Sequence, residues 1–76
     1  MFNRKGKKRK AINLLKSVAD NIRYYRMKRK LSQEQLEEET RLPVSRYESG
    51  RNDMTLTSIF ILSKELGVEP YKLLMK

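Results

Sequence analysis

The 76-residue sequence contains no cysteine, no histidine and no tryptophan. The absence of cysteine excludes disulfide bonds, and the absence of both cysteine and histidine excludes the usual zinc sites. It also excludes nucleophile and base pairs built on Cys or His. The remaining serines and carboxylates form no recognisable catalytic constellation. We therefore expect a protein that is not an enzyme and has no cofactor, metal or small-molecule substrate.

The chain also lacks a long apolar segment. No run approaches the roughly 18 apolar residues of a membrane-spanning helix. Lys16 and Asp20 interrupt the segment that follows the basic N-terminus, which therefore does not read as a signal peptide. We expect one domain with a modest core, because a chain of this length buries little apolar surface, and no association with membranes.

What the sequence has in excess is positive charge, and most of it lies in the first half. The net charge is +9, and residues 1–30 contain twelve Lys/Arg and one Asp. Residues 31–76 contain six Lys/Arg and eight Asp/Glu. This imbalance indicates a polyanionic partner, and nucleic acid is the most common one. The alternative is a solvated basic segment that only aids solubility.

Residues 1–10 are the most basic part of the chain, with six cations and no acidic residue. Because this segment cannot bury an apolar face, we predict a flexible arm over 1–10 and a folded domain over 11–76. The arm either binds DNA through the minor groove or the phosphates, or only attracts DNA from a distance. The candidate DNA-binding cations of the arm are Lys7, Lys8, Arg9 and Lys10.

Residues 11–76 show helical patterns and no strand pattern. Apolar residues at spacings of three and four predict a helix from about residue 12 to about residue 30. Ser32 and Gln35 form a capping-box pair at the start of a second helix, which should end near Thr40. A third helix is predicted at 44–49, with Pro43 in its first turn. A fourth helix is predicted at 56–66, with caps at Thr55 and Gly67. A fifth helix is predicted from Pro70 onward. The fold class is all-α with five helices.

Several segments resemble the Cro/phage-repressor (XRE) family of helix-turn-helix proteins. They are Ile-Arg-Tyr-Tyr-Arg at 22–26, Leu-Ser-Gln-Glu-Gln-Leu at 31–36, Val-Ser-Arg-Tyr-Glu-Ser-Gly-Arg at 44–51, and then Thr55-Leu56, Leu66-Gly67-Val68 and Leu73-Leu74. The similarity covers roughly residues 18–75. It implies a five-helix repressor-like DNA-binding domain, whose second and third helices form the helix-turn-helix and whose third helix enters the major groove.

The resemblance also implies where DNA would be contacted. Val44, Ser45 and Arg46 on the third helix would face base edges, and arginine can read guanine with two hydrogen bonds. Phosphate contacts would come from the first helix, the start of the second helix and the loop after the third. The residues expected there are Arg23, Ser32, Gln33, Arg51 and Asn52.

One further pair is implied by the resemblance. Arg26 and Glu48 fall on positions where the family pairs an arginine of the first helix with the glutamate that ends the third. Such an ion pair would fix the third helix on the first. The alternative is that Arg26 faces a phosphate.

The helix 2–helix 3 junction departs from the family pattern. The span from Leu31 to Glu48 is shorter than usual. The third helix has therefore either lost its first turn and kept 44–48, or it begins at Pro43 and ends early at Gly50. Glu37 stands where the family has a small residue, so it must be strained or swing outward. Arg41 replaces a glycine where a positive φ is usual.

These observations together predict a DNA-binding transcriptional regulator of the repressor or controller type. It would bind double-stranded DNA as a homodimer on a palindromic operator, and it would be a cytoplasmic, nucleoid-associated protein of a prokaryote or a phage. The alternatives are an antitoxin-like protein-interaction module with a toxin as partner, and a non-specific nucleic-acid binder acting through the arm. The candidate dimer surface comprises Phe60, Ile61, Tyr71 and Met75.

Overall fold

The structure, a computed structural model, describes residues 11–75. Within these residues there are five helices and no strand, which confirms the predicted fold class. The helices are α1 (Ile12–Lys28), α2 (Gln33–Thr40), α3 (Val44–Glu48), α4 (Leu56–Leu66) and α5 (Pro70–Leu74). The predicted arm at 1–10 lies outside the described residues. No helix in the described part of the chain is long and apolar enough to cross a membrane.

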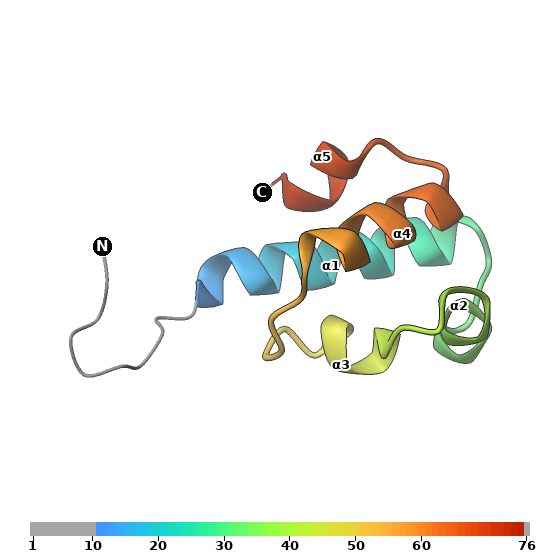
Figure 1. Ribbon diagram of the computed structural model, residues 1–76, viewed down its shortest axis with the longest axis horizontal. Coiled ribbons are helices and arrows are strands. Elements are labelled where there is room, and N and C mark those ends of the chain that lie inside the picture. The colour runs from blue at the N-terminus through green and yellow to red at the C-terminus, as the bar shows by residue number, and fades with distance from the viewer. Residues whose placement is uncertain (1–10, 76) are drawn as a thin grey trace.

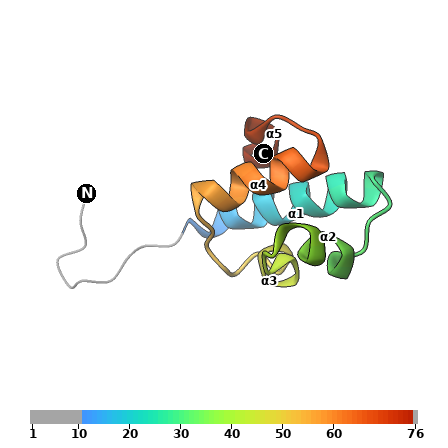
Figure 2. The same ribbon diagram turned by 45° about the vertical axis from the view of Figure 1, so that its right-hand side comes forward.

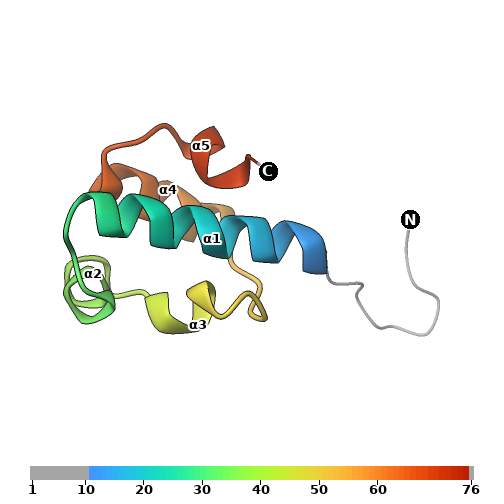
Figure 3. The ribbon, with the colours of Figure 1, turned by 180° about the vertical axis from the view of Figure 1, so that it is seen from behind.

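The long helix α1 runs through the middle of the domain and packs against α3, α4 and α5 (Figure 1). From the opposite side, α5 again lies along one edge, and α2 and α3 lie together along the other (Figure 3). An intermediate view shows the same separation (Figure 2). The helix pair α2–α3 therefore forms one edge of the domain, where α3 packs against α1 and α2 packs against α4.

A single apolar core joins the five helices. Ile22 of α1, Leu36 of α2, Val44 of α3, Leu62 of α4 and Leu73 of α5 are all fully buried. Every helix thus contributes at least one side chain with 0% exposure, although α3 and α5 have only five residues each. Such short helices are not stable alone, so their contacts with the core hold them in place.

The predicted helix caps are present in the structure. The Ser32 hydroxyl accepts the backbone N–H of Gln35 at 3.0 Å, and the Gln35 side chain accepts the N–H of Ser32 at 2.8 Å. The Thr55 hydroxyl accepts the N–H of Ser58 at 3.0 Å. Gly67 ends α4 with a φ of +72°, in the left-handed region that favours glycine. The beginnings of α2 and α4, and the end of α4, therefore follow from local chemistry.

The connections differ from prediction at two points. Helix α1 ends at Lys28, two residues before the predicted end at 30, because Lys30 adopts a left-handed φ of +57° and turns the chain towards α2. Pro43 is the N-cap of α3 and lies outside its first turn. Helix α3 covers 44–48 and keeps Glu48 opposite α1, as in the first of the two predicted arrangements.

Candidate nucleic-acid interface

Helix α3 exposes two side chains and buries the others. Ser45 and Arg46 are exposed, whereas Val44 is 0% exposed and Tyr47 is 8% exposed. Val44 and Tyr47 lie three positions apart and therefore share one helix face, which packs on the core. The prediction that the Val44 side chain contacts DNA is therefore wrong. Ser45 and Arg46 are the α3 side chains available to a base edge.

The end of α3 is fixed by a buried carboxylate. The Glu48 side chain is 1% exposed, and its two carboxylate oxygens accept hydrogen bonds from Arg26 Nε at 2.6 Å and Arg26 Nη2 at 3.0 Å. Gln33 Nε2 donates to the same carboxylate at 2.9 Å. Arg26 Nη1 donates to the backbone carbonyl of Leu31 at 2.7 Å. The ion pair implied by the resemblance is present, and it joins α1, α2 and α3.

The hydrogen bonds and the negative charge of Glu48 favour an ionised Arg26. The hydrogen bonds with Glu48 raise the pKa of Arg26, and they outweigh the opposing effect of burial. The Arg26 side chain is 12% exposed and is directed to Glu48 and Leu31. Arg26 therefore holds α3 in position and contributes little to the accessible surface of the candidate interface.

Two residues that are predicted to contact phosphate, Arg23 and Gln33, also hold α3 in place. Arg23 Nη2 donates to the backbone carbonyl of Glu48 at 2.9 Å, where a cation is favoured at the negative end of a helix dipole. Arg23 Nη1 lies 3.3 Å from the Asp20 carboxylate, and the Arg23 side chain remains 45% exposed. Gln33 is tied to Glu48, as described above. Arg23 and Gln33 thus anchor α3 at the surface where DNA is expected.

The beginning of α3 is fixed from α2. Its N-cap residue, Pro43, provides no side-chain hydrogen bond. Instead, a carboxylate oxygen of Glu37 accepts the backbone N–H of Ser45 at 2.9 Å. The hydrogen bond from the Ser45 backbone lowers the pKa of Glu37. The expected misfit at Glu37 is relieved because the carboxylate turns towards the first turn of α3.

Sequence reasoning recognised Glu37 as unusual but did not predict this contact. The available signal was the combination of an acidic residue late in α2 with a proline, which cannot cap through its side chain, before α3. The intervening turn is tight: Arg41 keeps the positive φ of the glycine that it replaces, at +61°, and its N–H donates to the Glu37 carbonyl at 2.7 Å.

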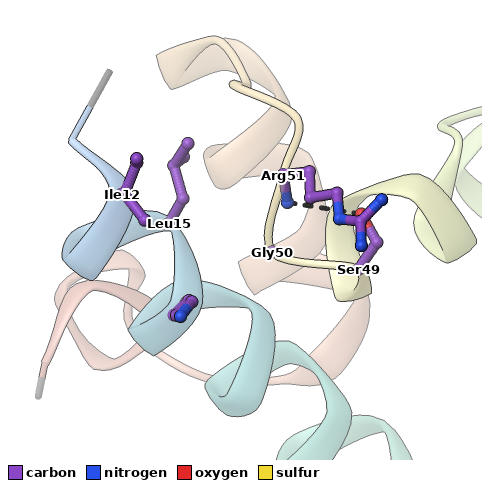
Figure 4. A pocket seen from close by; sticks show the side chains of 6 residues that line it. Ile12, Leu15, Ser49, Gly50 and Arg51 are labelled. Carbon is purple, nitrogen blue, oxygen red and sulfur yellow. Dashed lines mark hydrogen bonds between the residues drawn. The ribbon is translucent and has the colours of Figure 1, made fainter. Parts of the chain in front are cut away.

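The loop after α3 meets the first turn of α1 at a shallow cleft (Figure 4). Gly50 has a φ of +78°, and an added Cβ would lie 3.5 Å from Lys16 Cγ. Arg51 extends alongside Ser49, whose hydroxyl accepts the Arg51 N–H at 3.3 Å (Figure 4). Asn52 follows and is exposed. Lys16, which the sequence analysis did not select, therefore adds a cation beside the predicted phosphate-contacting loop.

Comparison with known proteins supports the family assignment. Residues 22–73 match the family model described as Helix-turn-helix. No curated protein matches the chain. The crystal structure of a hypothetical transcription factor, NHTF, from Neisseria is similar, with a TM-score of 0.79 and 30% sequence identity. The similarity covers 91% of this chain and 84% of the Neisseria chain. The chain therefore belongs to the helix-turn-helix family of the Cro/repressor (XRE) type.

Proposed function

We propose that the protein is a DNA-binding transcriptional regulator that places α3 in the major groove. The observation that carries this proposal is the presentation of Ser45 and Arg46 on a helix tied down at both ends, by Glu37 at its start and by Arg26 at its end. A fixed pair of side chains can discriminate between base edges, whereas a mobile pair cannot. Membership of the family and the similarity to the hypothetical transcription factor from Neisseria support it.

Contacts with phosphate would surround the exposed Ser45 and Arg46 of α3. The first turn of α2, with Ser32 and Gln33, presents backbone N–H groups and the positive end of a helix dipole. Arg23, Lys16 and Arg51 supply further cations from α1 and the loop after α3. Such contacts would fix the orientation of the domain, and Arg46 and Ser45 would read the sequence.

Selection of bound sites from random duplex DNA at moderate salt tests the proposal. We expect a palindromic motif to be enriched. The Arg46→Ala variant should lose about 1–3 kcal/mol of discrimination at one guanine position in each half-site. Lys64→Ala, which removes an exposed cation from α4, should leave the guanine preference within each half-site unchanged. Binding without any enriched motif would contradict sequence-specific regulation and favour the non-specific alternative.

We also propose that the protein binds DNA as a homodimer. Phe60 on α4, Tyr71 on α5 and Met75 directly after α5 are between 52% and 58% exposed, and Ile61 on α4 is partly exposed. Pairing two copies through such apolar side chains would present two α3 helices to a two-fold symmetric site.

Analytical ultracentrifugation tests the homodimer. The expected result is a dimer at micromolar concentration that dissociates when Phe60 is replaced by glutamate. Met27→Glu is the matched control, because Met27 is 62% exposed on α1 and lies outside the proposed surface. A monomer across the micromolar range, or equal dissociation by both variants, would contradict the proposed dimer surface.

The basic arm is proposed as an additional DNA contact. Residues 1–10 lie outside the described structure, so this proposal rests on their charge and on where the domain begins. Ile12, in the first turn of α1, lines the same cleft as Arg51. The arm is therefore connected to the domain beside the proposed phosphate contacts, where its cations would add salt-sensitive affinity.

A further inference from the structure

The first turn of α3 is completed by a residue of another helix. Helix α3 has only five residues, and a helix of this length is not stable alone. The Tyr47 N–H donates to the Pro43 carbonyl at 3.1 Å, which closes the first turn. Pro43 provides no side-chain cap, and the Ser45 N–H donates instead to the Glu37 carboxylate of α2 at 2.9 Å. Glu37 therefore supplies the cap that the residue before α3 does not provide.

The two sides of this first turn are held in different ways. Val44 is 0% exposed and packs in the core, which fixes the buried side of the turn. Ser45 and Arg46 are exposed. The hydrogen bond to Glu37 is made by the backbone of Ser45, between the buried Val44 and the exposed Arg46. This stretch of backbone sets the direction in which the Arg46 side chain leaves the helix.

The two ends of α3 also differ in how strongly they should affect stability. At the end of the helix, the side chains of Glu48 and Arg26 are 1% and 12% exposed, so removing one partner leaves a buried charge. At its start, Glu37 is partly exposed and Ser45 is exposed. Water can therefore bind the Ser45 N–H when the carboxylate is removed. We expect loss of the Glu37 cap to change the orientation of the first turn much more than the stability of the domain.

We propose that Glu37 is a positioning residue that fixes the direction of Arg46 and thereby sets how strictly the protein selects guanine. Arginine reads guanine through two hydrogen bonds, to O6 and N7, and both form only when the planar guanidinium is aligned with the base edge. A first turn that frays lets Arg46 leave this alignment. Glu37 acts through the α3 backbone and not through a contact of its own with DNA. This inference rests on the proposed function and adds a specificity determinant to the same site.

Three variants separate the hydrogen bond of Glu37 from its charge. Glu37→Met keeps the length of the side chain and removes the acceptor, whereas Glu37→Gln removes the charge and keeps an oxygen that can accept the Ser45 N–H. Glu38→Met is the matched control, because Glu38 is the exposed neighbour on α2. The measured quantity is the ratio of two affinities, for the duplex selected by the wild type and for the same duplex with adenine in place of the Arg46-dependent guanine. Loss of a negative charge strengthens binding to both duplexes alike and cancels in this ratio.

We expect the ratio to fall about tenfold in Glu37→Met and to stay near the wild-type value in Glu37→Gln and Glu38→Met. Amide hydrogen exchange without DNA provides a second measurement. The Ser45 amide should exchange about tenfold faster in Glu37→Met than in Glu37→Gln, because only the glutamine retains an acceptor. The urea midpoint of Glu37→Met should remain close to that of the wild type.

The outcomes separate this inference from the function on which it rests. A wild type without a guanine preference overturns the proposed function, and the inference with it. A wild-type ratio in Glu37→Met, or an equal loss in Glu37→Met and Glu37→Gln, overturns the inference alone. Equal exchange of the Ser45 amide in these two variants also overturns it. So does a urea midpoint of Glu37→Met as low as that of Glu48→Ala, because the residue would then act on folding and not on the direction of Arg46.

Discussion

Replacement of Glu48 by alanine is expected to lower the free energy of unfolding by about 3–5 kcal/mol. The substitution removes the carboxylate that accepts three hydrogen bonds, from Arg26 Nε, Arg26 Nη2 and Gln33 Nε2. The Arg26 guanidinium, whose side chain is only 12% exposed, would keep its charge and lose its partner. A small domain has roughly 5–15 kcal/mol of stability in total, so this variant should be close to unfolding.

Urea denaturation at neutral pH measures this effect. Arg26→Ala should be similarly destabilised, because it leaves Glu48 as a buried carboxylate. Asp20→Ala is the matched control: its bridge to Arg23 is exposed, and such bridges contribute no more than about 1 kcal/mol. Replacing both partners with apolar residues, as in Arg26→Met with Glu48→Leu, should recover much of the loss. If neither single substitution changes the midpoint, the pair has no structural role.

Neutralising the basic arm is expected to have the largest effect on DNA binding. If the four arm cations named above, Lys7, Lys8, Arg9 and Lys10, each neutralise one phosphate, their loss reduces the slope of log K against log salt by about 3.6. Raising salt from 50 to 200 mM would then weaken the wild type about a hundredfold more than the variant. Fluorescence anisotropy on a fixed duplex at several salt concentrations measures both slopes.

The neutralised variant carries glutamine at these four positions, which removes the charge and preserves the length of the chain. A second variant, in which residues 1–10 are deleted, should give at least as large a change in slope. Base preference should be the same in all three proteins, because phosphate contacts carry no sequence information directly. An unchanged slope would show that the arm does not meet phosphate in the complex.

Much of this architecture could be predicted from the sequence because its boundaries are set by local chemistry. Ser32 with Gln35, Thr55 and Gly67 each mark a helix end through a hydrogen bond or a backbone angle that the residue type favours. The left-handed turn at Lys30 could not be predicted, since lysine has no preference for that conformation. The predicted helix therefore ran two residues too far.

The candidate site was harder to predict, because its residues act across helices. Val44 is next to Ser45 in the sequence, and the orientation of α3 on the core buries the apolar Val44 and leaves Ser45 exposed. In a helix of five residues, periodicity provides too little signal to fix that orientation. Two other contacts, of Arg23 with the Glu48 carbonyl and of Glu37 with Ser45, depend on the packing angles between helices. The spacing of residues along the chain does not determine those angles.

Because α3 is short, one domain can contact only a few base pairs directly. Five helical residues extend about 7.5 Å, which is close to the rise of two base pairs. A two-fold pair of such helices would specify about four base pairs directly, a combination that recurs on the order of once every few hundred base pairs. Even a small genome would then offer thousands of equivalent matches. We therefore expect regulation to depend on clustered binding sites and on a high local concentration of the protein, rather than on a single isolated binding site.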